Sequence, residues 1–188
     1  TGEGGVILTN DYKLDKRLKL LRTSGIDKEL GRKKLVKKGG WFYEQKLLGF
    51  NYRMNDITAA IGMGQLQRID EIVGRRQEVG KLFLEMTSGF EWFIPQAIPD
   101  NCTHSYYTFS VDYRGLEYFG VSWKEFYNQY KALGGDGFYG IVAIPYTEPA
   151  IAGKTFGQTI CSPGLCPISE GLQQRVMCFK TNYRDIDD

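Results

Sequence analysis

Two stretches of the chain repeat apolar residues at the spacing of an α-helix. The first predicts a helix over Asp11–Thr23, which Ser24-Gly25 ends, with apolar positions at Leu14, Leu18 and Leu21. The second runs from Asn55, a favourable N-cap, to about Met86. At about 1.5 Å per residue, a single helix of that length would extend roughly 45 Å. Such a helix often connects two domains, and Gly74 marks the place where a bend or break is expected.

Shorter segments follow after about Phe90, and their patterns alternate between strand and helix. Tyr106–Tyr113 is rich in aromatic and β-branched residues, which predicts a strand. Ser122–Leu133 predicts a helix that begins with a capping box. Phe138–Tyr146 predicts a second strand, and Ser169–Lys180 predicts a final helix. This order indicates a small α/β domain in the last part of the chain.

The first residues have the pattern of a turn followed by a strand. Three glycines in the first five residues predict a tight turn, because glycine readily adopts positive φ angles. Glu3–Thr9 then predicts a short buried strand, with its apolar residues at Val6, Ile7 and Leu8. A tight turn needs neighbouring segments to pack on. We therefore expect the 188 residues to begin partway through a larger fold.

The composition is ordinary for a globular protein, with 42% hydrophobic and 24% charged residues. No run of 18 apolar residues predicts a membrane span, and the first ten residues lack the pattern of a signal peptide. The four cysteines are too few for a disulfide scaffold and favour a reducing cytoplasm. With one histidine and no standard zinc spacing in Cys161-x4-Cys166, we expect no metal site.

The net charge is only +2, but the positive charges gather near the start of the chain. Residues 11–50 contain twelve Lys or Arg and five Asp or Glu, and the densest part lies within the predicted loop Lys28–Gln45. This loop is either a solvated surface or a patch that attracts an anion such as a diphosphate. Binding of nucleic acid is disfavoured, because no groove-reading motif accompanies the charges.

A polar and aromatic segment, Gly49–Asp56, precedes the second predicted helix. Unpaired backbone N–H groups at a helix N-terminus favour anions. There Asn51 could donate its amide to a phosphate, and Arg53 could bind one with two parallel hydrogen bonds. The alternative is that Asn51 and Asn55 only form a turn and a cap, with Arg53 in a structural ion pair. Local chemistry alone favours this alternative.

Longer motifs carry a family resemblance. T-G-E-G-G-V-I-L-T-N-D, then L-L-R-T-S-G-I, then L-G-F-N-Y-R-M-N-D-I-T-A-A-I-G-M-G-Q-L-Q-R-I-D-E occur in this order between Thr1 and about Arg76. The chain resembles the second half of the sugar-nucleotide aminotransferases of the DegT/DnrJ/StrS group. These are pyridoxal-phosphate enzymes with the aspartate-aminotransferase fold. G-G-D-G-F-Y-G and C-P-I-S-E-G-L-Q-Q-R-V-M-C-F-K-T-N-Y resemble a subset of the same group.

The resemblance implies a fold class and a division of the chain. The fold expected is α/β, the C-terminal part of the pyridoxal-phosphate-dependent transferase fold. Residues 1–54 would be the end of the cofactor-binding large domain, and residues 55–88 the long connecting helix. Residues 89–188 would form the small C-terminal α/β domain. The family also implies a homodimer, with no nucleic acid or membrane as partner.

The resemblance also implies where the chemistry lies. In this family the lysine that forms the Schiff base with pyridoxal phosphate directly precedes the T-G-E-G-G turn, so it would lie upstream of Thr1 and no catalytic residue is expected in these 188 residues. Asn51 would reach the phosphate of the cofactor in the partner subunit. The basic aromatic loop before it would lie near the mouth of the substrate site.

Substrate residues are harder to assign. Family members commonly carry a histidine near the position of Tyr146-Thr147-Glu148-Pro149, and this chain has none there. The candidates for contact with the sugar nucleotide are Tyr52, Arg53, Asp136, Tyr139, Tyr146 and Glu148. Roles in turns and packing are equally compatible with the four candidates after residue 100.

The implied reaction moves an amino group, expected to come from glutamate, onto a keto-deoxy sugar nucleotide for cell-surface or secondary-metabolite sugars. The polypeptide alone is expected to be inactive without the upstream lysine. Two alternatives remain open. One is a sugar 3-dehydratase, because some relatives carry histidine in place of that lysine. The other is a non-catalytic interaction domain.

Overall fold

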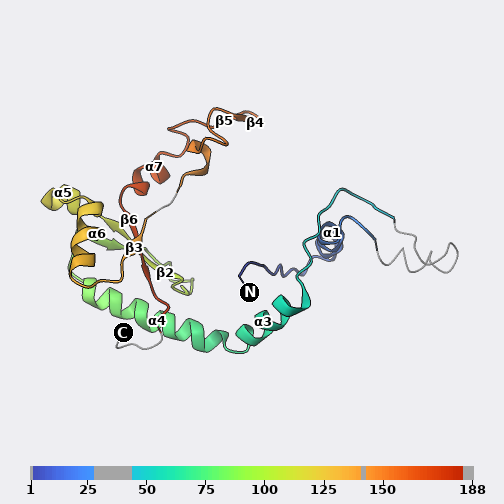
Figure 1. Cartoon of the computed structure of the whole chain (residues 1–188), viewed down its shortest axis with the longest axis horizontal. Coiled ribbons are helices and arrows are strands. Elements are labelled where there is room, and N and C mark those ends of the chain that lie inside the picture. The colour runs from blue at the N-terminus through green and yellow to red at the C-terminus, as the bar shows by residue number, and fades with distance from the viewer. Residues whose placement is uncertain (1, 28–43, 141–142, 184–188) are drawn as a thin grey trace. The chain divides into compact units, whose positions relative to one another are not determined.

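The computed structural model describes residues 2–27, 44–140 and 143–183 (Figure 1). These residues fall into two compact units, residues 1–68 and residues 69–188, and each is described by itself. In the described part of the chain, no helix is both long enough and apolar enough to cross a membrane.

The described residues of the first unit include two helices of eleven residues each. α1 spans Tyr12–Arg22, and the side chain of Asp11 caps its N-terminus by accepting hydrogen bonds from two backbone N–H groups. α3 spans Asp56–Leu66, and the side chain of Asn55 caps it by accepting from the Thr58 N–H at 2.8 Å. Both helices begin where the sequence predicts, since a side-chain oxygen replaces a missing intrahelical acceptor at each start.

The second unit is built on a four-stranded antiparallel sheet with the order β1-β2-β6-β3. The strands are β1 (Phe93–Pro95), β2 (Thr108–Tyr113), β3 (Phe138–Tyr139) and β6 (Val176–Lys180). β6 lies between β2 and β3, so Phe109 and Phe138 both face Phe179 in the register. A separate hairpin joins β4 (Thr155–Phe156) to β5 (Thr159–Ile160).

Side chains from two helices pack against the sheet and complete the core of the second unit. α4 (Ile69–Thr87) contributes Phe83, whose ring stacks on Phe109 with centroids 4.9 Å apart. α6 (Trp123–Ala132) contributes four aromatic side chains, which pack against the same cluster. The buried cluster consists of Phe93, Phe109, Val111, Tyr113, Phe138, Met177 and Phe179. Alternate residues of β2 and β6 are buried, as expected for strands with one covered face.

Short helices complete the second unit. α5 spans Gly115–Phe119, and α7 spans Pro167–Gln173. A 3₁₀ helix, η1, spans Pro145–Thr147. The predicted helix over Ser122–Leu133 is confirmed by α6, which begins with the predicted capping box between Ser122 and Glu125.

The predicted strand over Glu3–Thr9 is wrong. Residues 5–9 form no regular structure, and Val6, Ile7 and Leu8 are 76%, 70% and 90% exposed. A strand exists only where a second strand accepts and donates its backbone hydrogen bonds. None of the described residues of this chain pairs with this segment.

The single helix expected from Asn55 to about Met86 is divided. α3 ends at Leu66 and α4 begins at Ile69, so Gln67 and Arg68 interrupt it. Gly74, where a break was expected, lies inside α4. A lone glycine in a helix costs only about 1 kcal/mol relative to alanine, which an otherwise favourable helix tolerates.

The predicted final helix over Ser169–Lys180 is confirmed only up to Gln173 and is wrong beyond it. The helix α7 ends at Gln173, and the following residues form the strand β6. The sequence V-M-C-F-K has alternating burial and pairs on both sides, with β2 and with β3. Pairing and burial across the sheet therefore override the apolar spacing that suggested a helix.

The predicted strand over Phe138–Tyr146 is much shorter than expected. β3 contains only Phe138 and Tyr139, and residues 141–142 lie outside the described part of the chain. Pro145 stands at the start of η1, because its ring fixes φ near the helical value and it has no N–H to donate to a sheet.

Candidate functional site

The end of α1 is held by a returning segment of the first unit. We call residues 20–27 together with residues 44–52 the clasp. Three backbone N–H groups donate to carbonyl oxygens across the clasp. Ser24 donates to Phe50 at 2.9 Å, Phe50 donates to Leu21 at 3.2 Å, and Tyr52 donates to Arg22 at 3.0 Å. An isolated antiparallel bridge joins Thr23 to Asn51. The clasp therefore fixes the backbone on both sides of Asn51.

Two glycines allow this close approach. Gly25 has a φ of +73°, and a Cβ atom there would lie 1.8 Å from the carbonyl oxygen of Leu47. At Gly49 a Cβ atom would lie 2.6 Å from the backbone nitrogen of Gly25. Real Cβ atoms do not approach backbone this closely, so both positions require glycine. The glycines of the S-G and L-G-F motifs are thus required because the clasp leaves no room for a side chain at Gly25 or Gly49.

Asn51 is exposed, and its side chain is oriented by Arg53. The Arg53 Nε donates to the Asn51 Oδ1 at 2.9 Å, and the Arg53 backbone N–H lies at 3.4 Å from the same oxygen. Within the described residues the Asn51 Nδ2 has no hydrogen-bond partner. Asn51 and Arg53 are both exposed, so their amide and guanidinium groups can donate hydrogen bonds to a ligand.

This donor set fits a phosphate group. A phosphate oxygen accepts hydrogen bonds from amide and guanidinium groups, and a guanidinium also neutralises its charge. The neighbouring Tyr52 is 70% exposed, and its ring lies 5.5 Å from that of Phe50. The structure therefore brings Asn51, Tyr52 and Arg53 together at one exposed place. The basic loop predicted before them lies outside the described residues from position 28 to position 43.

The candidates in the second unit fall into two separate groups. Tyr139 is the last residue of the short strand β3, and Asp136 lies two residues before the strand begins. The Asp136 carboxylate pairs with Lys180 at 3.4 Å and also contacts Tyr183. Burial, followed by the charge of Asp136, raises the pKa of Tyr183 to about 12. Tyr139 is 49% exposed and stands opposite Cys178 in the sheet.

Tyr146 and Glu148 form the other group, at η1. Tyr146 donates its hydroxyl hydrogen to Glu170 Oε1 at 2.5 Å, and its oxygen accepts from the Cys166 N–H at 3.1 Å. Glu148 is exposed, and its backbone carbonyl accepts from Ile151. The hydrogen bonds of Tyr146 thus go to α7 and the loop before it, and not to Asp136 or Tyr139.

Sequence reasoning missed Glu170. This residue lies on α7, and both its oxygens accept from the Gly164 N–H, at 2.7 and 3.0 Å. The pKa of Glu170 is lowered, first by the hydrogen bond from Tyr146 and then by the one from Gly164. Its only signal in the sequence was an acidic residue in the first turn of a helix. Such residues are common there because a negative charge stabilises the positive end of the helix dipole.

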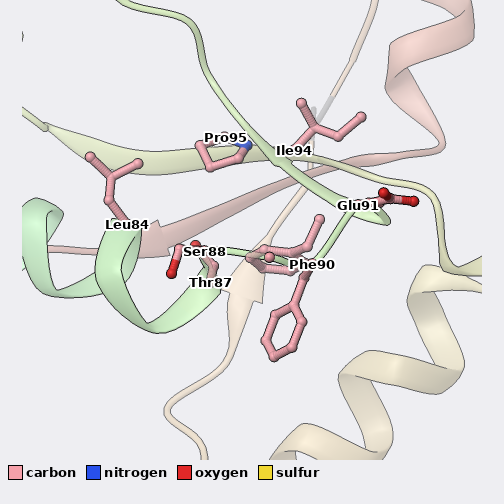
Figure 2. A pocket seen from close by; sticks show the side chains of 9 residues that line it. Leu84, Thr87, Ser88, Phe90, Glu91, Ile94 and Pro95 are labelled. Carbon is pink, nitrogen blue, oxygen red and sulfur yellow. The ribbon is translucent and has the colours of Figure 1, made fainter.

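A hollow of about 390 Å³ lies elsewhere in the second unit, between the end of α4 and β1. Figure 2 shows the side chains of Leu84, Phe90 and Ile94 around it. Glu91 is the only charged residue in its lining. The hollow lacks the cations that a nucleotide diphosphate needs, and none of the sequence-predicted site residues lines it.

Known proteins match most of this chain. The model of the DegT/DnrJ/EryC1/StrS aminotransferase family matches residues 1–179. GDP-perosamine synthase of Caulobacter vibrioides is 44% identical over 79 residues, which are 42% of this chain and 18% of that enzyme. UDP-4-amino-4,6-dideoxy-N-acetyl-beta-L-altrosamine transaminase of Campylobacter jejuni is 35% identical over 83 residues, 44% of this chain and 20% of that enzyme.

A solved structure agrees in fold. The sugar aminotransferase CalS13 from Micromonospora echinospora superposes with a TM-score of 0.68 at 19% identity, over 95% of this chain and 42% of that one. The predicted α/β fold class is therefore confirmed as part of the fold of these enzymes. The chain spans about two fifths of that structure, and its matches to the two curated relatives span about a fifth of each.

Proposed function

Because this chain belongs to the DegT/DnrJ/EryC1/StrS aminotransferase family, we propose that it is part of a pyridoxal-phosphate-dependent aminotransferase acting on nucleotide-linked keto-deoxy sugars. The match over residues 1–179 carries this proposal. The names of the relatives, a GDP-perosamine synthase and a transaminase of a UDP-linked amino sugar, support a nucleotide sugar as substrate. We propose glutamate as the amino donor, the cytoplasm as the location, and polysaccharide or secondary-metabolite sugars as the product class.

The bound cofactor would supply an electron sink for the exchange of the amino group. In this chain, Asn51 would donate its side-chain N–H groups to a phosphate oxygen of the cofactor held by a partner subunit. Arg53 would keep the amide in the orientation that it has here, since its Nε holds the Asn51 oxygen at 2.9 Å. The clasp would keep both residues in place. Their task is binding and orientation, without any transfer of protons.

For the residues of the second unit, contact with the substrate has less support. We propose Tyr139 and Glu148 as contacts for the sugar nucleotide, because both are exposed. Asp136 and Tyr146 are retained as candidates, although each already has partners in the chain. Tyr52 would stack or hydrogen-bond at the same place as Arg53, since its side chain is 70% exposed.

We also propose the division implied by the family. Residues 1–54 would belong to the cofactor-binding domain, residues 55–88 would connect the domains, and residues 89–188 would form the small domain. The interruption at Gln67 and Arg68 would then fall within the connecting region.

We expect the chain to self-associate as a dimer. α3 is apolar on most of its surface, yet none of its residues is buried within the first unit. Ile57, Met63 and Leu66 are 76%, 65% and 63% exposed. A helix that is apolar all round is normally covered. Sedimentation velocity should show a species of twice the 21.4 kDa chain mass that Met63→Lys weakens. A stable monomer at all concentrations would contradict this expectation.

Titration with a nucleotide sugar tests the proposed function against an interaction domain. Calorimetry with UDP- and GDP-linked sugars should show saturable binding that Arg53→Gln weakens about tenfold, the effect of one lost hydrogen bond to a charged group. Arg75→Gln is the matched control, because Arg75 pairs with Glu71 on α4. Absence of binding would favour the interaction domain. The sugar 3-dehydratase remains the alternative within the family.

A further inference from the structure

One carboxylate ties together three segments of the second unit. Glu170 on α7 accepts the hydroxyl hydrogen of Tyr146 from η1 at 2.5 Å. It also accepts the backbone N–H of Gly164, from the loop before α7, at 2.7 and 3.0 Å. The Cys166 N–H closes the ring by donating to the Tyr146 oxygen at 3.1 Å. We call Tyr146, Gly164, Cys166 and Glu170 the latch.

The latch closes the base of a long excursion of the chain. Between Tyr146 and Gly164 the chain makes the β4–β5 hairpin, and few of its residues are buried. Within the excursion, hydrogen bonds from Gly153 to the Cys161 carbonyl at 2.7 Å and from Cys161 to the Lys154 carbonyl at 3.0 Å hold the hairpin base. Since the hairpin has little core of its own, its position depends on the latch.

The latch also determines what Tyr146 can offer to a ligand. A phenol has one hydrogen to donate, and that hydrogen is engaged by Glu170. The oxygen already accepts from Cys166 and keeps one further lone pair. Tyr146 can therefore accept a hydrogen bond from a sugar hydroxyl, but it cannot donate to a phosphate while the latch is closed.

We propose that Glu170 is a positioning residue, which through its ionised carboxylate fixes Tyr146 as an acceptor and holds the excursion between Tyr146 and Gly164 in place. Its relevance to substrate rests on the proposed function, because only there does Tyr146 face a sugar nucleotide. The latch itself does not rest on the proposed function, because its four residues lie within this chain and their hydrogen bonds need neither cofactor nor substrate.

The charge state of Glu170 controls the latch. The titratable group that contacts it in the described structure is Tyr146 from η1, Cys166 interacts with it through its backbone, and α7 carries no other charged residue. The pKa of Glu170 is lowered below its ordinary value of 4.5, so its contribution is complete above that pH. The contribution is lost as the pH falls through the lowered pKa, because a neutral carboxyl is a weaker acceptor than a carboxylate for the hydrogen bonds from Tyr146 and Gly164.

Amide hydrogen exchange on the full 188-residue chain tests the latch. Glu170→Gln should speed exchange at Gly164 and Cys166 about tenfold relative to wild type at neutral pH, because a neutral amide oxygen replaces the charged acceptor. Glu148→Gln, which removes an exposed carboxylate from the same excursion, should leave both amides unchanged. Unchanged exchange in Glu170→Gln would overturn the proposal, as would equal effects of the two variants.

The pKa of Tyr146 shows whether Glu170 acts on the Tyr146 hydroxyl or only stabilises the fold around it. Burial, and after it the hydrogen bond to Glu170, raises the pKa of Tyr146 to about 12. Glu170→Gln should lower this pKa while leaving it above 10.0, because burial remains. Tyrosine ring signals followed by NMR resolve Tyr146 when compared with Tyr146→Phe. A Tyr146 pKa that does not fall would overturn the proposal.

The wild-type chain supplies a measurement that does not depend on the folding of any variant. The Gly164 amide resonance should shift only in acid, below pH 4.5, together with the carboxyl carbon of Glu170. If the two titrate at different pH values, Glu170 does not control the loop. None of these measurements involves cofactor or amino transfer, so failure of the latch and failure of the proposed function are distinguishable.

Discussion

Gly25→Ala is expected to open the clasp and to lower the free energy of unfolding of the first unit by more than about 3 kcal/mol. The φ of +73° alone costs about 1–2 kcal/mol for a residue with a Cβ atom. The larger part comes from the Leu47 carbonyl, which would lie 1.8 Å from that atom and is backbone, so it cannot rotate away. Native-state exchange should show at least about a hundredfold loss of protection at the Ser24, Phe50 and Tyr52 amides.

Two matched variants separate the causes. Gly120→Ala carries the same conformational cost, at a φ of +71°, but its Cβ atom would meet nothing within 4 Å. It should cost only about 1–2 kcal/mol in the second unit. Gly64→Ala, also unobstructed and inside α3, should be neutral or stabilising by up to about 1 kcal/mol. If Gly25→Ala behaved like Gly120→Ala, the close packing of the clasp would be refuted.

Residues with a local cause were predictable from the sequence. The starts of α1, α3 and α6 depend on Asp11, Asn55 and Ser122, whose side chains reach backbone groups within three residues. The core strand β2 was predicted for a similar reason, since its aromatic and β-branched residues alternate across one face. Such contacts are made between residues close in the sequence, so the sequence alone is enough to predict them.

Structure that depends on distant partners was not predictable in this way. Val176–Lys180 has an apolar spacing that also suits a helix, and only its neighbours β2 and β3 make it a strand. The segment at Val6 reads as a strand but has no partner within the described residues. Gln67 and Arg68 carry no breaker residue, so the gap between α3 and α4 had no signal in the sequence.

The candidate site divides along the same line. Asn51 and Arg53 were singled out from the sequence, and the structure adds that the Arg53 side chain orients the Asn51 amide. The requirement for Gly25 and Gly49 comes from a contact between segments more than twenty residues apart. Glu170 escaped notice because its partner Tyr146 lies 24 residues away. Their roles toward cofactor and substrate stay predictions.

A second large effect is expected from the cofactor. The proposed function, through the family resemblance, expects no lysine of the 188 residues to hold pyridoxal phosphate. The chain alone, treated with the cofactor and borohydride, should therefore carry only weak and scattered adducts on its many lysines. Peptide mass spectrometry should find no lysine modified in stoichiometric amount. One fully modified lysine would mean that the chain holds the cofactor in a way the family does not predict.

Supplying a large-domain polypeptide with the cofactor lysine is expected to allow the chemistry. A polypeptide that carries the large domain of a family member up to its cofactor lysine would be mixed with this chain and pyridoxal phosphate. Asn51→Ala should then weaken cofactor binding by about tenfold or more, because one hydrogen bond to a charged phosphate is lost. Asn128→Ala is the control, since Asn128 is an exposed amide on α6. Equal cofactor affinity for both variants would remove Asn51 from the site.

The most direct measurement is amino transfer by this mixture, with glutamate and a nucleotide-linked keto-deoxy sugar as substrates. The amino sugar nucleotide and 2-oxoglutarate would be quantified together by mass spectrometry. We predict equal amounts of the two products from the mixture and none from either part alone. Turnover by the 188-residue chain alone would contradict this account, as would a stable mixture that binds cofactor and nucleotide sugar but forms no amino sugar.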